Sequence, residues 1–350
     1  MDVSGRISVS IENGQRQDDP AAAGKRRTGG ATSERVQYAF AMAIPFGYSL
    51  RPPTPYDLEA VGEVLVADDP DEDTRTLDAG FVRSEWSRPG FDAATDAWVV
   101  VDGHGVVVGY AQVMLEDQDI ADSWGVVHPE HRGRGLGSAL LDRVEARAGA
   151  LLAGLASSRL RHAIEARDGA AAALLRARGL RPVRHFWHMQ IDLVEPLEQG
   201  LAPEGTVIGA IAPREDLAAV HAVLHEAFAG DWEYHPGPFD RWSEDHASDP
   251  GYDPTLWLLA REGHTPVGAV TAIVSDGRGW VNELGVVPAQ RRRGIAAALV
   301  RCLFVTFARR GVRRVILNVD AQNPTGATTL YERVGMRVVK RWVLWERSPV

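Results

Sequence analysis

The sequence predicts two consecutive domains of the α/β class (α+β mixed, with a mainly antiparallel sheet in each). A glycine-containing basic loop between an apolar strand and a helix occurs twice, and the copies stand 159 residues apart, since 291 − 132 and 294 − 135 give the same offset. The same order of elements surrounds both loops, as expected of a duplicated domain. A chain of 350 residues also has the length for two domains of ordinary size.

In the first half, the pattern begins with a short strand at 48–51, followed after a proline-rich turn by a helix to about residue 67. Apolar strands at 97–101 and 106–113 flank an Asp-Gly-His-Gly turn, which is a strong hairpin signal. Periodicity then predicts a strand ending at Val127, a helix at 135–148, a strand at 160–165, a helix at 169–178 and a closing strand region to Leu193.

The second half repeats this order. It begins with a strand at 206–208 and a helix near 214–229, followed by a hairpin of strands at 256–261 and 266–274. After the second basic loop, the pattern predicts a helix to Arg310, a strand at 315–319, a helix near 324–334 and a strand at 337–345.

These elements set the expected domain boundaries. We place the first domain at 47–195 and the second at 205–350, joined by a linker at 196–204 that contains prolines and a glycine. Residues 1–46 show no sustained periodicity, and we expect them to form a disordered extension.

Bulk composition excludes several classes of partner. A net charge of −9 gives no electrostatic case for binding nucleic acid or an anionic membrane. The single cysteine, Cys302, lies among apolar residues and is expected to be a buried hydrophobe in a reducing, cytoplasmic compartment. No apolar run approaches the roughly 18 residues of a transmembrane helix. His221 and His225 share a helix face without an evident third ligand, so no metal is expected.

The two basic loops are candidate anion sites. The candidate residues of the second copy are Arg291, Arg292, Arg293, Gly294 and Ala296. Those of the first copy are Arg132, Gly133, Gly135 and Gly137. Their backbone N–H groups belong to a loop and a first helical turn, where no intrahelical acceptor is available, and the helix dipole favours an anion there. The loops therefore predict pyrophosphate binding; the alternative is an ordinary strand-loop-helix with a solvated arginine cluster.

Both loops resemble the acetyl-CoA loop of the GNAT acetyltransferases, whose pattern is Gln/Arg-x-x-Gly-x-Gly/Ala. The matching residues are Arg132, Gly135 and Gly137 in one copy and Arg291, Gly294 and Ala296 in the other. The order of elements is also that of a GNAT domain, so the resemblance covers nearly everything after the extension. It implies two tandem GNAT domains that use acetyl-CoA as cosubstrate.

A second resemblance is confined to the second half. Residues 323–336 are similar to the GNAT segment Asn-x-x-x-Ala-x-x-Leu-Tyr-x-x-x-Gly-Phe, with methionine in place of the final aromatic residue. The resemblance implies that Asn323 contacts the cofactor arm and that the Tyr331 hydroxyl protonates the departing thiolate. In the first half, Arg167 and Leu175 occupy the aligned positions, so that copy is expected to lack the acid.

The strand at 280–286 supplies the remaining groups. The resemblance implies that this strand splays from its neighbour at a bulge and that the amide of Val286 faces the thioester carbonyl oxygen. Glu283 is the nearest carboxylate and could accept the ammonium proton directly or through water; the alternative is an ordinary glutamate near a strand end. The family's acidic residue would fall near Trp280 instead. The first copy has Trp124 at the position of Glu283, so it is expected to lack the base as well.

Residues 231–242 alternate aromatic and acidic side chains where GNAT domains place their acceptor-binding loop and second helix. The candidate substrate contacts are Trp232, Tyr234 and Trp242. The alternative is that these aromatic side chains pack in the core.

The sequence thus predicts an N-acetyltransferase that moves acetyl from acetyl-CoA to an amine in its C-terminal domain, after a degenerate N-terminal copy that keeps the cradle but not the catalytic groups. The expected acceptor is a small-molecule amine. The alternatives are an acetyltransferase for a protein or peptide amine and a non-catalytic acyl-CoA-binding regulatory protein. The sequence carries no signal for the oligomeric state.

Overall fold

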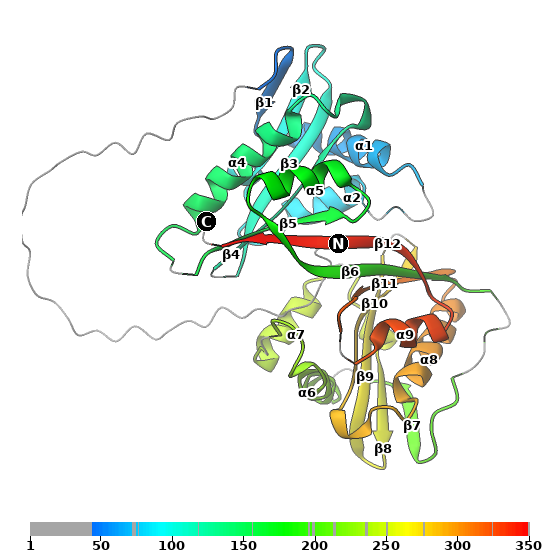
Figure 1. The fold of residues 1–350 in the computed structure, drawn as a ribbon. Helices are drawn as coiled ribbons and strands as arrows, with labels where there is room; N and C mark the ends of the chain where they lie inside the picture. The colour runs from blue at the N-terminus through cyan, green and yellow to red at the C-terminus, as the bar shows by residue number, and fades with distance from the viewer. Residues whose placement is uncertain are drawn as a thin grey trace, which may run out of the picture.

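The computed structural model describes residues 44–71, 75, 77–117, 119–155, 157–194, 197, 200–212, 215–234, 237–249, 251–275, 277–323 and 325–348. The predicted extension, up to residue 43, lies outside the described residues. The rest forms two lobes that share one sheet (Figure 1).

The first half of the chain follows the predicted order of elements. Its strands are β1 (Tyr48–Arg51), β2 (Ala97–Asp102), β3 (Val107–Asp117), β4 (Ile120–Val127), β5 (Arg159–Glu165) and β6 (Arg181–Asp192). Its helices are α1 (Leu58–Asp68), α2 (Ala79–Trp86), α3 (Ala93–Asp96), α4 (Leu136–Leu151) and α5 (Gly169–Ala177), with 3-10 turns η1 (Pro55–Asp57) and η2 (Pro129–His131). Helices α2 and α3 lie where the sequence pattern predicts no element. Asp78 caps α2 by accepting the Phe81 N–H at 3.1 Å, a local signal that the apolar pattern does not carry.

The second half repeats the arrangement. Its strands are β7 (Thr206–Ala210), β8 (Leu258–Glu262), β9 (Thr265–Ser275), β10 (Arg278–Val286), β11 (Arg314–Asp320) and β12 (Arg337–Arg347). Its helices are α6 (Leu217–Phe228), α7 (Phe239–Ala247), α8 (Ile295–Arg309) and α9 (Ala327–Arg333), with 3-10 turns η3 (Pro254–Leu256) and η4 (Pro288–Gln290). Helices of each half cover both faces of the sheet. The side chains of β2 alternate between these two faces. Val100 packs in the core beneath α4, whereas Val99 and Val101 pack in a second core with α1.

The closing strands of the two halves are exchanged. The sheet runs in the order β1-β2-β3-β4-β5-β12-β6-β11-β10-β9-β8-β7. Strand β12, the last of the second half, pairs antiparallel with β5 of the first half, and β6 pairs antiparallel with β11 of the second. Figure 1 shows β12 and β6 side by side between the two lobes. Strand patterns predict that these strands exist but not which edge each one joins.

The exchange carries core residues from one half into the other. Val343 and Trp345 of β12 belong to the core under α4 and α5 in the first half. Met189 of β6 is fully buried in the core of the second half. Burying one such side chain is worth about 1.5–3 kcal/mol, so each lobe depends on the strand that the other half supplies. The predicted boundaries at 47–195 and 205–350 describe segments of the chain and stay a prediction. They do not describe the lobes, because each lobe also contains a strand that comes from the other segment.

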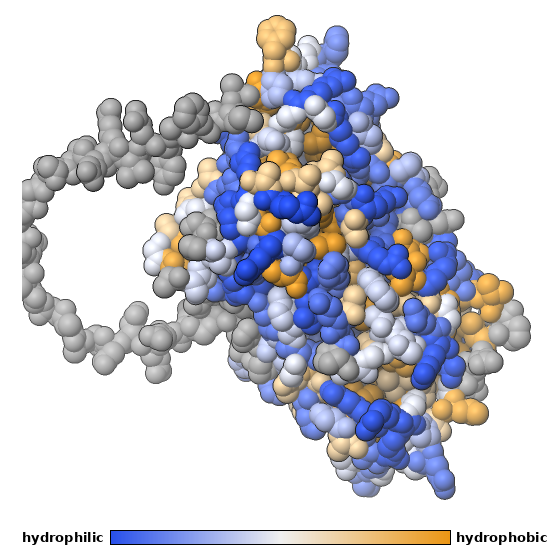
Figure 2. Space-filling view, viewed as in Figure 1, coloured by the Kyte–Doolittle hydropathy of each residue, from blue (hydrophilic) through white to orange (hydrophobic). Residues whose placement is uncertain are grey.

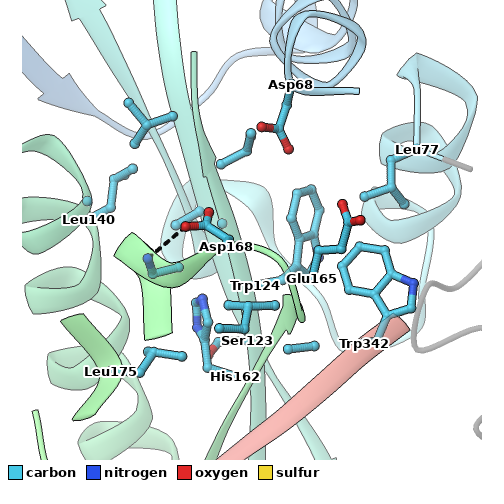
Figure 3. Close-up of a pocket in the computed structure, with 18 of the residues that line it drawn as sticks. Asp68, Leu77, Ser123, Trp124, Leu140, His162, Glu165, Asp168, Leu175 and Trp342 are labelled. Atoms are coloured by element: carbon cyan, nitrogen blue, oxygen red, sulfur yellow. Dashed lines mark hydrogen bonds between the residues drawn. The ribbon is translucent and has the colours of Figure 1, made fainter. Parts of the chain in front are cut away.

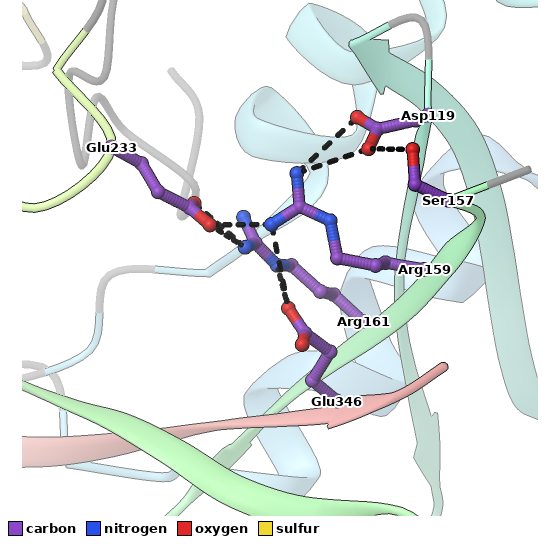
Figure 4. Close-up of polar contacts among 6 residues, drawn as sticks. All are labelled: Asp119, Ser157, Arg159, Arg161, Glu233 and Glu346. Carbon is purple, nitrogen blue, oxygen red and sulfur yellow. Dashed lines mark hydrogen bonds and ion pairs between the residues drawn. The ribbon is translucent and has the colours of Figure 1, made fainter. Parts of the chain in front are cut away.

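An ion-pair cluster ties the lobes together beside the exchanged strands (Figure 4). Arg161 of β5 donates to both oxygens of Glu233, at 2.7 and 2.6 Å, and to Glu346 of β12 at 3.0 Å. Arg159 pairs with Glu233 and also with Asp119 at 3.2 Å. Glu233 is one of two non-glycine residues with a left-handed backbone in the described part of the chain, at φ 52°. The loop of the second half is therefore held against β5 in a strained conformation.

The surface has mixed polarity. Figure 2 shows polar side chains over most of the face in view, with hydrophobic residues in small scattered groups. The large exposed hydrophobic residues include Tyr56, Leu201 and Val207. Among the helices of the described residues, none has the length and apolar character needed to cross a bilayer.

Candidate active site

Strand β10 parts from its neighbour beside the second basic loop. It pairs in parallel with β11 only from Arg278 to Trp280. Its register with β9 shifts between Val281 and Glu283, which marks a bulge at Asn282. The backbone from there to the end of β10 opens toward the gap between β10 and β11. The splay and the bulge implied by the family resemblance are therefore confirmed, while the predicted contact of the Val286 amide with a thioester oxygen stays a prediction.

The two basic loops share one backbone conformation. The glycine before each helix is left-handed, with φ 89° at Gly294 and 83° at Gly135. Arg292 is left-handed as well, at φ 62°, where the first copy has Gly133 at 74°. Successive residues in such conformations turn their N–H groups into one concavity, which binds anions. An arginine held at positive φ is a strained residue at the point where the anion is expected.

The start of α8 completes this cradle. The first intrahelical bond runs from the Ala298 N–H to the Gly294 carbonyl at 3.0 Å, so the N–H groups of Ile295, Ala296 and Ala297 precede the helical ladder. A β-carbon at Gly294 would meet Pro203 Cγ, at 4.0 Å, as its nearest atom, so the space above the glycine is open. The 15-residue helix adds its dipole. A pyrophosphate group fits this site.

The first arginine of each loop binds the neighbouring strand end and helix. Arg291 donates from Nε to the Val286 carbonyl at 3.2 Å and from Nη2 to a carbonyl in the last turn of α6 at 2.5 Å. Arg132 donates in the same way to the Val127 carbonyl at 3.1 Å and pairs with Asp68 at the end of α1. These side chains fasten the loop to the strand end and to the helix, which leaves the backbone N–H groups of the loop available as donors to an anion.

Two other residues predicted to bind the cofactor have partners within the protein. Arg293 pairs with Glu262 at 2.5 Å. The Asn323 side chain accepts the Thr325 N–H at 2.8 Å and donates to Asp231 at 3.3 Å. Asn323 thus caps the segment before α9 and connects it to the loop after α6. Its contact with a cofactor arm stays a prediction.

Glu283 is a buried carboxylate, not the surface residue of the alternative interpretation. Only 7% of it is exposed. His246 Nε2, from α7, lies 3.0 Å from its Oε2, and the Thr271 hydroxyl of β9 donates to the same oxygen at 3.0 Å. Two elements therefore fix the carboxylate on the α7 side of the sheet, next to the bulge in β10.

The position of His246 determines where its protons lie. Its Nδ1 is 2.8 Å from the Trp242 carbonyl, which can only accept, so Nδ1 carries a hydrogen. Its Nε2 faces Oε2 of Glu283. One proton is then shared between the imidazole and the carboxylate, either as an imidazolium with a carboxylate or as an imidazole with a carboxylic acid. Glu283 and His246 form a single proton-holding unit.

Tyr331 lies on α9 and is buried, 8% exposed, against the core of the second half. Burial raises the pKa of its hydroxyl above the ordinary value, so the group keeps its proton at neutral pH. Tyr234 is half-buried between Phe228 and His225. Burial, with the charges of Glu283 and Asp231, raises the pKa of Tyr234 to about 12. Both tyrosines are therefore hydrogen-bond donors under neutral conditions.

The aromatic residues of the 231–242 segment divide into two groups. Trp242 is buried and packs on His246, with ring centroids 4.3 Å apart, and on Trp257 at 5.7 Å, so the structure places it in the core. Trp232 lies between the guanidinium groups of Arg161 and Arg184, each 5.0 Å from its ring centroid. Both arginines come from the first half. Trp232 therefore stands at the junction of the lobes, and its predicted role in substrate binding stays a prediction.

Comparisons with known proteins agree with this geometry. Residues 217–336 match the model of the acetyltransferase (GNAT) family, and residues 93–179 match that of an acetyltransferase (GNAT) domain. A mycothiol acetyltransferase of Streptomyces scabiei is 35% identical over 239 residues, covering 65% of this chain and 72% of that protein. The chain belongs to the GNAT acetyltransferase family. A mycothiol acetyltransferase of Cellulomonas flavigena is 32% identical over 255 residues, covering 68% and 71%.

Solved structures show the same tandem GNAT architecture. A GCN5-related N-acetyltransferase from Sphaerobacter thermophilus superposes with a TM-score of 0.77 at 34% identity, covering 87% of this chain and 96% of that one. A tandem GNAT protein from the clavulanic acid biosynthesis pathway has a TM-score of 0.64 at 19% identity and shares the fold. The chain is a tandem GNAT enzyme that resembles mycothiol synthase, the mycothiol acetyltransferase of these relatives.

The first GNAT domain contains a cavity of about 790 Å³, which we call the first-half cavity (Figure 3). The cradle residues Arg132, Gly135 and Gly137 lie in its wall, as does Leu175, at the position of Tyr331. Residues of the second half also line it, namely Trp232, Asn318, Lys340, Trp342 and Leu344, of which the last three belong to the exchanged strand β12. Figure 3 shows Trp342 of β12 facing the same space as Trp124 and Glu165. The site of the first GNAT domain is therefore built by both halves.

Sequence reasoning missed His246 and Thr271, which hold Glu283. No motif includes either residue, since one lies in α7 and the other on β9. A weak signal exists for His246, because it follows Trp242 by four residues and shares its helix face. Only the fold shows that this face meets Glu283.

Proposed function

We propose that the second GNAT domain transfers the acetyl group of acetyl-CoA to a small-molecule amine. The observation that carries this proposal is the order of features along β10. The buried pair of Glu283 and His246 stands at the bulge, and the strand then leads into the anion cradle at the start of α8. Bound acetyl-CoA would supply the acetyl group as an activated thioester, with its pyrophosphate in the N–H groups of the loop and of α8. The single cysteine and the intracellular supply of acetyl-CoA lead us to place the reaction in the cytoplasm.

The unit of Glu283 and His246 accepts the proton that the amine must lose. Thr271 and His246 both bind Oε2, and this arrangement keeps the carboxylate oriented beside the strand opening. Backbone N–H groups exposed in β10 stabilise the negative charge that develops on the thioester oxygen. Tyr331 donates a hydrogen bond to the leaving thiolate, and its raised pKa ensures that the proton is present to donate.

The relatives support the class of acceptor. They are mycothiol acetyltransferases, and the resemblance to mycothiol synthase implies a cysteinyl aminoglycoside as the acceptor. An acceptor of this kind carries an amine on a small polar molecule. Asp231 and Tyr234 lie in the loop after α6, and the charges of Asp231 and of Glu283 on β10 both act on the Tyr234 hydroxyl, so these groups provide polar partners for the acceptor. Trp280 in place of an acidic residue sets this site apart, so the acceptor can differ in structure from that of the relatives.

The test is thiol release from acetyl-CoA in the presence of a cysteinyl aminoglycoside, simple amino sugars, polyamines and a lysine-containing peptide. Release that depends on one of the small amines supports the proposal. Release with the peptide alone would assign a protein or peptide acceptor. A protein that binds acetyl-CoA tightly but releases no thiol with any of them would instead be an acyl-CoA-binding regulator.

A further inference from the structure

The first-half cavity contains a carboxylate that the comparison of the two copies missed. Asp122 lies on β4 and lines the same cavity as Arg132 and Gly135 of the first cradle. The nearby arginines are engaged by other carboxylates. Arg88 pairs with Glu116 at 2.7 Å, and Arg161 forms the cluster with Glu233 and Glu346. Asp122 therefore lines a cavity of about 790 Å³, and in the described part of the chain these two arginines form ion pairs with other carboxylates.

A difference in register explains why a constant offset hides this residue. In β10 the bulge at Asn282 shifts the pairing with β9, so that Trp280 stands opposite Ile273. Strand β4 has no shift at this point, and Asp122 stands opposite Met114. Met114 and Ile273 are equivalent positions, since 273 − 114 equals 159. Asp122 thus occupies the place of Trp280, and each half has one carboxylate on its central strand at a different position.

The surroundings of Asp122 favour proton exchange near neutral pH. Burial and the negative charges of Glu116 and Glu233 raise the pKa of Asp122 to about 7, although Arg161 and Arg88 act in the opposite direction. The other titratable groups in the cavity wall are Asp68, Asp69, Asp71, Glu85, His131, Arg132, His162, Glu165, Arg167, Asp168 and Lys340. Arg132, Lys340 and Arg167 pair with Asp68, Asp69 and Glu165. The remaining carboxylates give the cavity an excess of acidic groups, which favours a cationic ligand such as an ammonium group.

We propose that the first-half cavity is a second acyl-transfer site for a small amine, in which Asp122 takes the proton that the nitrogen loses on acylation and returns it to the departing thiolate. The proposal rests on the proposed function only in using the same thioester donor. The first half lacks equivalents of Tyr331 and Glu283. On this proposal it uses a different catalytic group and has not lost its activity.

The step balances with one carboxylate. As the amine nitrogen attacks the carbonyl carbon, a C–N bond forms and the C–S bond breaks, and the sulfur leaves with the bonding electron pair. An ammonium group first releases one proton to solvent, because its nitrogen cannot attack without a free electron pair. The carboxylate of Asp122 takes the second proton, which the nitrogen loses as the amide forms. A thiol has a pKa of roughly 8.5, so a carboxylic acid with a pKa near 7 passes this proton to the thiolate downhill. The products are an amide, a free thiol and the ionised carboxylate, and no tyrosine is needed.

The experiment uses the full chain with the second site disabled by Glu283→Gln and Tyr331→Phe. Thiol release from acetyl-CoA is measured with ethylamine, ethanolamine, glucosamine and spermidine between pH 5.5 and 9. We expect amine-dependent release to persist, to increase as pH rises through about 7, and to fall at least tenfold when Asp122→Asn is added. Glu130→Gln is the matched control, because it removes a carboxylate after β4 that does not line the cavity.

Folding of the Asp122→Asn protein is checked by its melting temperature. An ionised, buried carboxylate destabilises the folded state, so the variant should melt several degrees higher at pH 8 and nearly unchanged at pH 4. The inference is wrong if the disabled chain releases no thiol with any of these amines, or if a folded Asp122→Asn variant releases it as fast as its parent. If the unmodified chain releases thiol and the disabled chain does not, the proposed function of the second domain is supported and the inference about the first-half cavity is wrong. An inert unmodified chain contradicts both.

Discussion

At the scale of single residues, function depends on proton positions that the backbone determines. Glu283 is fixed by His246 and Thr271, and His246 is itself fixed by the Trp242 carbonyl. A glutamate near a strand end is ordinary in sequence, whereas a buried glutamate sharing a proton with a histidine is a group prepared for proton transfer. The same physical chemistry keeps the Tyr331 proton in place, because burial disfavours the phenolate.

Replacing Tyr331 by phenylalanine should lower kcat by about 100-fold while leaving the KM for acetyl-CoA nearly unchanged. The substitution removes the hydroxyl and keeps the ring in the core, so the cradle is not disturbed. Steady-state kinetics and an acetyl-CoA titration measure the two quantities. An unchanged kcat would assign the proton of the leaving thiolate to water.

Glu283→Gln should reduce turnover most at low pH, and the loss should shrink as pH rises, because a free amine needs no base. His246→Ala should show the same pH dependence with a smaller loss, since the histidine acts through Glu283. His246→Gln keeps a donor to Oε2 and should recover part of the rate. The measurement is a pH-rate profile for each variant. A loss independent of pH in Glu283→Gln would mean that this side chain positions the substrate or supports the strand.

At the scale of elements, the strand-loop-helix unit occurs twice with one backbone conformation. The sequence predicted this unit well, because glycine spacing and an apolar strand are local signals. It predicted neither α7 as the support of Glu283 nor the partners of β6 and β12. Those depend on contacts between residues far apart in the chain, such as His246 with Glu283 and Trp345 with the first-half core. The family resemblance implied a bulge in this strand, but its position at Asn282, which hid Asp122, is visible only as a change in pairing.

The two cradles should bind two acetyl-CoA molecules per chain. Calorimetry should show two sites, and Gly135→Glu or Gly294→Glu should each remove one, because a side chain at positive φ strains the loop and a carboxylate repels the phosphates. Gly133→Arg is the matched control. It reproduces the residue that the second copy carries there, at φ 62°, and should preserve both sites. If calorimetry instead shows a single site that is lost only in Gly294→Glu, the first cradle does not bind acetyl-CoA.

At the scale of the whole molecule, the exchanged strands make two GNAT domains one structural unit. A single sheet passes through both lobes, and the cluster of Arg159, Arg161, Glu233 and Glu346 joins them at its side. The same exchange places Lys340 and Trp342 of the second half in the wall of the first-half cavity. Duplication therefore produced two sites that share walls, and a change in one strand affects both.

Both lobes should consequently unfold in one transition. Trp345→Ala removes a buried side chain that the second half contributes to the first-half core, and we expect a loss of about 3 kcal/mol in the free energy of unfolding. Hydrogen exchange should then accelerate in α4 of the first lobe and in α8 of the second to the same degree, because neither lobe keeps its core without the exchanged strands. Val207→Ala, at an exposed position of the edge strand β7, should change neither rate. Faster exchange in α4 alone would show that the lobes open separately, with β12 leaving the first lobe while the second stays folded.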